Sequence, residues 1–382
     1  MPLTTSSSAR SHPVAECFDV AIIGAGMAGA SLAAELGPDM RVIVLEAEDQ
    51  PGYHATGRSA AFWEQCYGGP EIVPLTSASG PWLRDHGFLG DRGALYLARQ
   101  QDQPAIDEFF RKFAGADVSP VQIGRDQLES HVPGLMPEWD RAIHQPQCAD
   151  IDVAGLHQHY LGVARANGAR VQCRSRLAAA KRHLDGWDLQ LENGETISAG
   201  VLANAAGAWA DRVAQIAGAH PLGITPFRRT VVQLRTDPAP PADLPLCLDI
   251  SGNFYFRPEN GKLWLSPHDE IPSDPCDAAP EEFGVALAID RLEHVLDWRI
   301  EAVEHKWAGL RSFAPDRRPI YGYDAEVPGF FWFAGQGGYG IQTAPAAARL
   351  GAQLLKGEPR DAMTQALDVK LYEPARFAKA SA

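Results

Sequence analysis

The chain has 382 residues, of which 45% are hydrophobic and 21% charged, with a formal net charge of −14. A chain of this length usually forms more than one domain, and the composition is typical of a globular enzyme with a sizeable apolar core. Because so acidic a protein repels phosphate backbones and anionic lipid surfaces, no nucleic-acid partner is expected.

The amino-terminal residues and the cysteines indicate the cellular compartment in which the protein is expected. Residues 1–16 contain a single arginine and no apolar run, so we expect a disordered tail rather than a signal peptide. No stretch reaches the roughly 18 apolar residues that a membrane span needs. The six cysteines are scattered without a C-x-x-C pair, which favours reduced thiols in a cytoplasmic protein and no metal site.

The first ordered segment has the pattern of a strand, a glycine turn, a helix and a second strand. Residues 18–23 are almost entirely apolar, as in a parallel strand that is covered on both faces. A helix is expected from about Met27 to Leu36, ended by Gly37 and Pro38, and residues 41–46 form the next strand. This βαβ pattern predicts a parallel sheet.

The rest of the chain returns to this pattern after a long interruption at residues 67–150. A helix beginning near Val153 and strands at 170–173, 201–207 and 329–334 are expected, with a closing helix from Pro345 to about Leu355. Between them, alternating runs at 230–234, 254–257 and 262–265 predict a separate antiparallel sheet.

The glycine turn matches a dinucleotide-binding motif. Gly24, Gly26 and Gly29 follow the spacing G-x-G-x-x-G between a strand and a helix, and Glu46 ends the following strand. Such glycines permit a tight turn and the close approach of a pyrophosphate to the helix N-terminus, while the acid accepts hydrogen bonds from ribose hydroxyls. The motif predicts a dinucleotide cofactor but does not separate NAD from FAD.

Three further segments rich in small residues follow predicted strands, at 54–61, 204–209 and 336–343. Their backbones could approach a flat cofactor closely, and the last one precedes a helix whose N-terminus would favour a reduced, anionic flavin. The alternatives are a surface loop, a packing turn and a plain capping turn.

Two arginines and two tyrosines are candidates for ligand contact. Arg229 precedes a predicted strand, and Arg311 lies in the segment Trp307-Ala308-Gly309-Leu310-Arg311-Ser312-Phe313. Arginines in mainly apolar surroundings require a carboxylate or phosphate partner, which could equally be a structural salt bridge. Taken alone, Tyr67 and Tyr255 would be ordinary core or surface tyrosines.

Together these motifs resemble the FAD-dependent D-amino acid oxidase superfamily, and within it most closely the D-amino acid dehydrogenases of the D-arginine dehydrogenase type. The resemblance runs from Phe18 to about Leu355. It rests on GAGMAGAS, PGYHATGRSAA, DIDVAGLHQHYL, NAAGAW, HKWAGLRSF and QGGYGIQT, which occur in the order of the family.

The resemblance implies an α/β fold with a Rossmann-type FAD-binding domain and a substrate domain built on a mainly antiparallel β-sheet with helices. The FAD-binding domain would comprise residues 17–66, 151–216 and 316–375, and the substrate domain residues 67–150 and 217–315. The FAD would be non-covalent, because residues 311–321, where some relatives tether the flavin, contain no cysteine. The FAD contacts implied are Gly24, Gly26, Ala28, Gly29, Glu46, Ala47, Ala55, Thr56, Gly57, Arg58, Ser59, Ala60, Ala61, Leu177, Gly207, Gly337, Gly338, Tyr339, Gly340, Ile341 and Gln342.

The resemblance also implies a reaction, the oxidative deamination of a D-amino acid. Arg229 and Arg311 would hold the substrate carboxylate, Tyr67 and Tyr255 would supply hydroxyls, and the Gly338 carbonyl would meet the amine. Hydride would pass from Cα to flavin N5, and the imino acid would hydrolyse to a keto acid and ammonia. Oxygen and a quinone both stay open as electron acceptors. The alternatives are another carboxylate-bearing amine or 2-hydroxy acid as substrate, or an NAD(P)-dependent dehydrogenase.

Three positions depart from the D-arginine dehydrogenase pattern. Phe62 replaces a histidine, Glu64 a threonine, and Ala94 the glutamate that meets the guanidinium. With Leu246 and Leu248, Phe62 and Ala94 favour a pocket for bulky apolar D-amino acids. We expect Glu64 to point to solvent; the alternative is that it meets a cationic substrate side chain from another direction.

Overall fold

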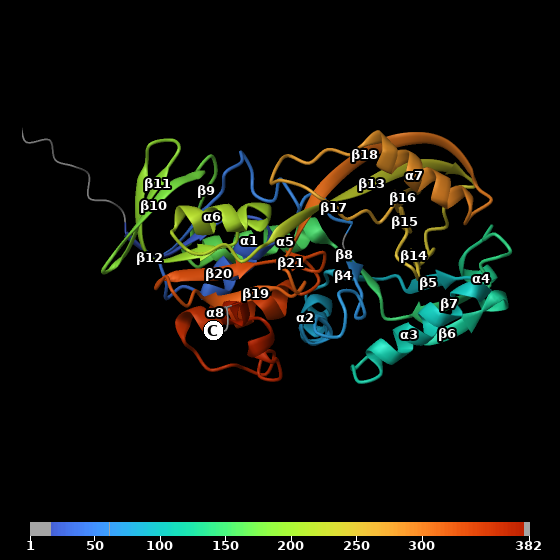
Figure 1. The fold of residues 1–382 in the computed structure, drawn as a ribbon, viewed down its shortest axis with the longest axis horizontal. Helices are drawn as coiled ribbons and strands as arrows, with labels where there is room; N and C mark the ends of the chain where they lie inside the picture. The colour runs from blue at the N-terminus through green and yellow to red at the C-terminus, as the bar shows by residue number, and fades with distance from the viewer. Residues whose placement is uncertain (1–16, 61, 378–382) are drawn as a thin grey trace, which may run out of the picture.

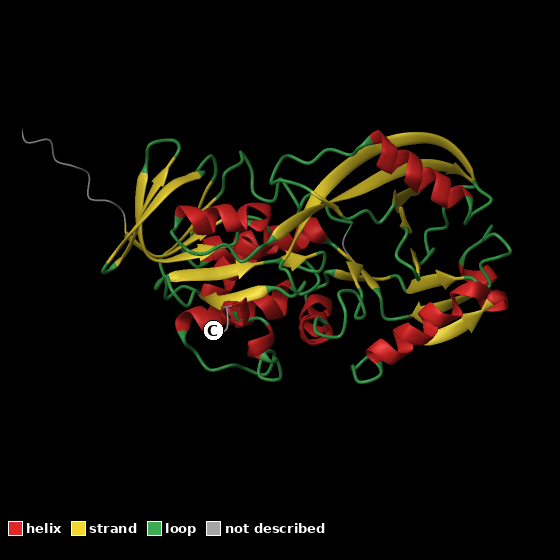
Figure 2. Cartoon of the chain, viewed as in Figure 1, coloured by secondary structure: helices red, strands yellow, loops and turns green. Residues whose placement is uncertain are grey.

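The structure is a computed structural model that describes residues 17–60 and 62–377. Two parts lie side by side (Figure 1). One is a sheet between helices, which include α8, and the other is a long curved sheet with helices α7, α3 and α4 (Figure 1 and Figure 2). The predicted disordered tail and Ala61 lie outside the described residues.

The first sheet is built around five parallel strands in the order β9-β2-β1-β12-β20. They are β1 (Cys17–Ile23), β2 (Val42–Leu45), β9 (Arg170–Gln172), β12 (Thr196–Asn204) and β20 (Phe330–Ala334). Every residue of β2 and β20 is buried, as expected for strands covered on both faces. Antiparallel strands extend the sheet on the side of β12 that faces away from β1: β19 (Ile320–Tyr323) pairs with β20, and the hairpin β10 (Leu177–His183) and β11 (Gly186–Leu191) pairs with the start of β12.

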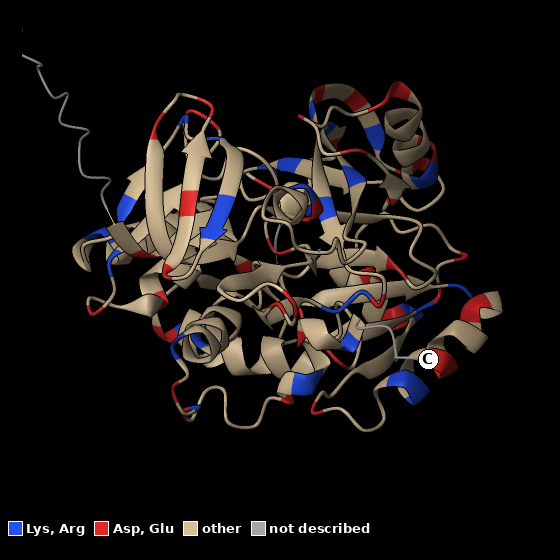
Figure 3. Ribbon diagram, turned by 60° about the vertical axis from the view of Figure 1, so that its left-hand side comes forward, with Lys and Arg blue, Asp and Glu red and all other residues tan. Residues whose placement is uncertain are grey.

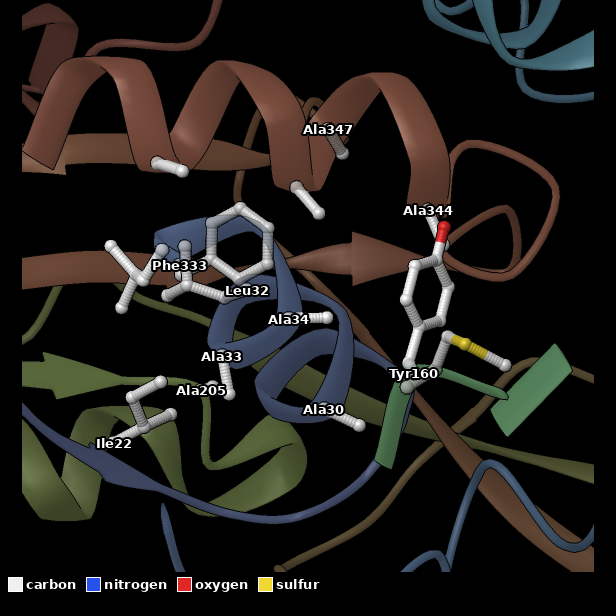
Figure 4. Close-up of a cluster of buried hydrophobic side chains, with 14 of the residues drawn as sticks. Ile22, Ala30, Leu32, Ala33, Ala34, Tyr160, Ala205, Phe333, Ala344 and Ala347 are labelled. Carbon is white, nitrogen blue, oxygen red and sulfur yellow. The ribbon is translucent and has the colours of Figure 1, made fainter. Parts of the chain in front are cut away.

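Alternate residues of β1 face two different cores. Val20 and Ile22 belong to the cluster under α1 (Met27–Leu36), α5 (Val153–Ala166) and α8 (Ala344–Lys356). Small residues of α1 and α8 allow these helices to pack closely against each other and against Phe333 (Figure 4). Ala21 and Ile23 face the opposite core, which is covered by α6 (Ala210–Ile216).

The second sheet has ten strands in the part of the chain described. Its order is β21 (Gln336–Gly337), β18 (Arg299–Phe313), β13 (Thr225–Asp237), β16 (Lys262–Ser266), β15 (Tyr255–Glu259), β14 (Leu246–Asp249), β5 (Ala94–Ala98), β7 (Arg141–Gln145) and β6 (Val121–Gly124), with β17 (Ile271–Pro272) beside β13. The described pairs are antiparallel except β14 with β5, which are parallel. Its helices are α3 (Gln103–Phe113), α4 (Arg125–His131) and α7 (Glu282–Glu293).

A three-stranded sheet lies between the two parts. It consists of β3 (Phe62–Trp63), β8 (Ala149–Ile151) and β4 (Leu89–Asp91), and α2 (Val73–Asp85) follows β3 in the chain. Short 3-10 helices complete the elements: η1 (Gln100–Asp102), η2 (Gly207–Trp209), η3 (Val369–Leu371) and η4 (Pro374–Phe377).

The α/β fold expected from the sequence is confirmed, with strand bounds that differ mainly in the second sheet. Strand β13 has 13 residues, far more than the run expected at 230–234, which lies within it. Its partner β18 has 15 residues. Both strands have exposed polar side chains toward one end, and a strand of that composition is not recognised by its apolar residues. Basic and acidic residues are spread over both parts (Figure 3). Within the described ranges, no helix is long and apolar enough to cross a membrane.

Candidate active site

The glycine turn between β1 and α1 forms an open cradle. Gly24 has φ +101°, and a side chain there would meet the Ala205 carbonyl oxygen at 2.6 Å, so both the turn and the close approach require glycine. The Ala25 amide donates to Glu46 Oε2 at 2.8 Å, which ties the turn to the end of β2. Gly26 precedes α1, and the Met27 amide donates to Thr56 Oγ1 at 2.9 Å. Gly26, Met27 and Ala28 line the cavity, so an anion there would lie at the N-terminus of α1.

One long cavity runs from this cradle to the two arginines. It lies between the first sheet and the strands β13 and β18, and its walls come from segments far apart in the sequence. Most of the residues expected to contact a cofactor line it: Gly24, Gly26, Ala28, Glu46, Ala47, Ala55, Thr56, Arg58, Ser59, Ala60, Leu177, Gly207, Gly337, Gly338, Gly340 and Ile341.

Four of the expected cofactor residues lie behind the cavity wall instead. Gly29 lets α1 pack onto the Gly24 carbonyl, and Gly57 would meet the Gly52 carbonyl oxygen at 2.7 Å if it had a side chain. Tyr339 packs against Phe313 in a separate apolar cluster. Gln342 is buried and hydrogen-bonds the backbone of Glu64 through both its amide oxygen and its amide nitrogen, at 3.2 Å each. These four therefore shape the wall and do not reach its surface.

Arg58 lines the cavity, but the protein itself engages its guanidinium. Nη1 donates to the carbonyl oxygens of Ala278 at 2.8 Å and Ala308 at 3.2 Å, and Nη2 forms an ion pair with Asp277. The carbonyl of Arg58 accepts a 3.0 Å hydrogen bond from the Trp307 indole. Arg58 thus ties the loop after β2 to the second sheet.

The two arginines expected to hold a carboxylate stand on neighbouring antiparallel strands. Arg229 of β13 pairs with Gly309 of β18, and Arg311 lies two residues further along β18 on the same face. Diagonal neighbours of this kind are about 7 Å apart at Cα, within reach of two long side chains that meet one ligand. Both arginines line the cavity, and Gly309 leaves the position opposite Arg229 open.

The protein holds the Arg229 side chain in place. Arg229 is 3% exposed; its Nε donates to the Asp269 carbonyl at 2.7 Å, and its Nη2 contacts Glu270 at 3.2 Å. Burial, and secondly the charge of Arg311, lower the pKa of Arg229. Its Nη1 has no hydrogen-bond partner within the described chain although it is buried. An unpaired donor of a buried cation can donate a charge-assisted hydrogen bond to an anionic ligand.

Tyr67 and Tyr255 approach the arginines from two sides. The Tyr67 hydroxyl accepts a 2.6 Å hydrogen bond from Arg311 Nη1 and lies against Gly338, where any side chain would clash with it. Tyr255 lines the cavity, is 1% exposed, and its hydroxyl also lacks a partner among the described residues. Two buried donors, on Arg229 and Tyr255, are therefore available at this end of the cavity.

The residues expected to form an apolar substrate pocket are packed together away from the cavity surface. Phe62, Ala94, Leu246 and Leu248 belong to one buried cluster with Ala60 and Tyr255, and none of the four lines the cavity. The expectation that they face the substrate is wrong for this structure. The parallel pairing of β14 with β5 brings Leu246 beside Ala94, so the two side chains pack against each other.

Glu64 does not point to solvent as expected. It is fully buried, its Oε2 accepts from the Tyr96 hydroxyl at 2.7 Å, and its Oε1 accepts from the Cys66 amide at 3.0 Å. Burial without a cationic partner raises the pKa of this carboxyl to about 7. It does not line the cavity either, so the structure places it behind the site.

Sequence reasoning missed several residues at the site. Asp269 and Glu270 orient Arg229 from a loop 40 residues further along the chain, which no local spacing reveals. His268 lies beside Tyr255, with ring centroids 5.7 Å apart, and donates from Nδ1 to the Gly252 carbonyl at 2.9 Å. Burial and the two arginines lower its pKa to about 3, so its imidazole is neutral. Ser175, Trp209 and Arg212 also line the cavity.

These residues fit a flavin dinucleotide. The glycine cradle and the N-terminus of α1 suit a pyrophosphate, and Glu46 at the end of β2 suits a ribose. At the other end, Gly337 and Gly338 bring backbone to the cavity surface beside the arginines, where a ring and a small anion could meet.

Comparison with known proteins defines the class. The family model of FAD dependent oxidoreductases of the DAO type matches residues 19–354. The "FAD-dependent oxidoreductase domain-containing protein 1" of Xenopus laevis is 23% identical over 89% of this chain and 79% of its own. The mitochondrial dimethylglycine dehydrogenase of Mus musculus is 27% identical over 62% of this chain, which spans only 29% of that protein.

A solved structure, the glycine oxidase from Geobacillus kaustophilus, superimposes with a TM-score of 0.82 at 22% identity and covers 94% of this chain and 99% of its own. This similarity supports the fold. Since the family model spans most of the sequence, the chain belongs to the DAO family of FAD-dependent oxidoreductases. FAD is therefore the cofactor, and the NAD(P)-dependent alternative is wrong.

Proposed function

We propose that the protein catalyses the FAD-dependent oxidative deamination of a D-amino acid. Oxidation of an amine or amino acid is supported by the family and by relatives named for glycine and dimethylglycine. The D configuration is supported by the resemblance of its motifs to the D-amino acid dehydrogenases.

The observation that supports this proposal best is the pair of buried arginines on one face of β13 and β18. A planar carboxylate satisfies the unpaired Nη1 of Arg229 and meets the guanidinium of Arg311. Holding the carboxylate at two points orients the Cα–H bond, which lowers the entropy cost of the reaction.

The residues of the chain then have separable tasks. Arg229 and Arg311 bind and orient the carboxylate, the Tyr255 hydroxyl donates to the carboxylate, and Gly338 offers a carbonyl to the N–H of the amine. The glycine turn after β1, Glu46 and the segment Gly337–Gly338 would hold FAD, which would supply the two-electron oxidant for the Cα–H bond while the amine lone pair forms the C=N bond. The imino acid that leaves is hydrolysed by water to a keto acid and ammonia. No side chain is assigned as a base, because a neutral amine needs none.

Anaerobic spectroscopy of enantiomer pairs tests this proposal. D-alanine is expected to bleach the 450 nm flavin band (roughly the absorbance of any oxidised flavin), whereas L-alanine at the same concentration should bleach it far more slowly. Faster bleaching by L-alanine would contradict the D configuration and leave the amino acid class intact. Bleaching by a 2-hydroxy acid such as D-lactate, and by neither alanine, would contradict the deamination itself.

A further inference from the structure

Tyr255 lines the cavity at the end where the arginines lie, and the Phe62 ring, which also contacts the Tyr67 ring, packs behind it. The Phe62 ring meets the Tyr67 ring edge-on, with centroids 5.5 Å apart and planes at 64°, and meets Tyr255 at 6.4 Å and 73°. Of these three side chains, only Tyr255 reaches the cavity surface. The rings therefore separate the carboxylate site from the apolar cluster behind them.

The space behind the rings is already filled. Phe62 is 6% exposed, and Ala94, Leu246, Leu248 and Cys148 behind it are all buried in the same cluster. Interiors of this kind are close-packed, so a side chain can enter only if other atoms leave.

The rings are also held in place. The Tyr67 hydroxyl is fixed between Arg311 and Gly338, and Tyr255 is packed between Phe62 and His268. Moving Tyr67 away would break its 2.6 Å hydrogen bond to Arg311, which is the residue expected to hold the substrate. A substrate that displaces the rings would therefore weaken its own binding site.

We infer that the substrate is an α-amino acid whose side chain is hydrogen or methyl, and that Phe62 determines this limit on size. The inference rests on the proposed function, since it places the carboxylate on Arg229 and Arg311. It reverses the preference for bulky apolar side chains that the sequence suggested. The same apolar residues are present, but they form a wall instead of a pocket.

Carboxylic acids that lack the amine test the size limit by binding alone. Acetate, propionate and 3-phenylpropionate correspond to glycine, alanine and phenylalanine, and each is titrated into the oxidised holoenzyme while the visible flavin spectrum is recorded. Acetate and propionate should perturb the spectrum, and 3-phenylpropionate should bind at least about tenfold more weakly than propionate. Equal or tighter binding of 3-phenylpropionate to the wild type would overturn the inference.

Two variants open the wall from opposite sides. Phe62→Ala removes one ring, and Leu248→Ala removes a side chain of the cluster from β14; each should narrow or reverse the difference between 3-phenylpropionate and propionate. Leu95→Ala is the matched control, because Leu95 lies on β5 beside Ala94 but packs into the separate core of the second sheet. If Leu95→Ala changed the ratio as much as the other two, or if neither of those two changed it, Phe62 would not set the limit.

The proposed function and the size limit can fail separately. If D-phenylalanine bleaches the wild-type flavin faster than D-alanine and glycine, the size limit is wrong and the deamination of a D-amino acid stands. If no α-amino acid bleaches the flavin and no carboxylate perturbs its spectrum, the carboxylate site is wrong and both fall. Bleaching by glycine and D-alanine, with D-phenylalanine slow, supports both.

Discussion

Arg311 Nη1 donates a 2.6 Å hydrogen bond to the Tyr67 hydroxyl oxygen, across 244 residues of sequence. The tyrosine accepts this bond and so fixes the Arg311 guanidinium beside Gly338. The bond joins β18 of the second sheet to the segment after β3, so the carboxylate site depends on the two parts of the molecule being correctly docked.

Replacing Arg311 with methionine should greatly reduce catalysis while FAD stays bound. The loss of one charge-assisted partner of a buried carboxylate costs about 2–5 kcal/mol, or about 30- to 4,000-fold in kcat/KM. Steady-state kinetics with D-alanine and the flavin content of the purified variant measure the two effects. Arg299→Met is the control, since Arg299 lies at the far end of the same strand, is exposed and pairs with Asp237. A near wild-type kcat/KM for Arg311→Met would exclude this carboxylate site.

Tyr67→Phe should weaken substrate binding through Arg311. A hydrogen bond to a charged group contributes about 1.5–3 kcal/mol, so the expected loss in kcat/KM is about ten- to a hundredfold, mostly as a higher KM. Tyr339→Phe is the matched control, because the Tyr339 hydroxyl is buried near Tyr67 but has no hydrogen-bond partner within the described residues. Equal losses in the two variants would show that the Tyr67 hydroxyl has no specific role.

Glu64 should make the free energy of unfolding fall as the pH rises. Its pKa is about 7 in the folded protein and about 4.5 for an unburied glutamate, so between these two pH values the folded state holds a proton that the unfolded state has released. Stability is then lost through this window, by about 3 kcal/mol in total. Glu64→Gln should remove this pH-dependent contribution to the free energy of unfolding, so the variant gains stability relative to wild type as the pH rises from about 4.5 to 7.

Chemical denaturation at several pH values measures that difference. Glu293→Gln, at an exposed position of α7, is the control and should follow the wild type. A difference between Glu64→Gln and wild type that stays constant with pH would mean that the carboxyl titrates alike in both states. The cluster that faces it, Tyr96, Cys66 and Cys148, has pKa values raised further by burial and titrates above this window.

The flavin is expected to be non-covalent. Acid precipitation of the holoenzyme should release all of the yellow colour into the supernatant. If a covalent bond to the flavin did form, Cys276 would be the candidate attachment point, because it is exposed and lines the cavity. A yellow pellet would contradict the prediction, and its loss in Cys276→Ser would identify the attachment point.

The residues expected at the cofactor site could be predicted from local sequence motifs. The glycine turn, Glu46 and the segments at 55–60 and 337–341 could be found from sequence because each is a short strand-to-turn unit whose role depends on its own backbone. The structure brings most of these residues to one cavity. Their contacts with FAD, the domain bounds and the cytoplasmic location stay predictions.

The substrate end was harder to predict, because side-chain direction there depends on pairings between distant strands. Ala94 and Leu246 face each other only because β5 and β14 pair across about 150 residues, a contact that no periodicity reveals. Glu64 turns inward because Tyr96, from β5, meets its carboxyl. Polarity alone predicted that Glu64 would face solvent.

The most direct test of the central claim compares D-alanine with ethylamine as anaerobic reductants of the yellow holoenzyme. Ethylamine has the same amine and methyl group but lacks the carboxylate that Arg229 and Arg311 are expected to hold. D-alanine should bleach the flavin rapidly and ethylamine should do so at least about a hundredfold more slowly, in keeping with the loss of a charge-assisted pair. Equal rates for the two compounds, or bleaching by ethylamine alone, would contradict the account.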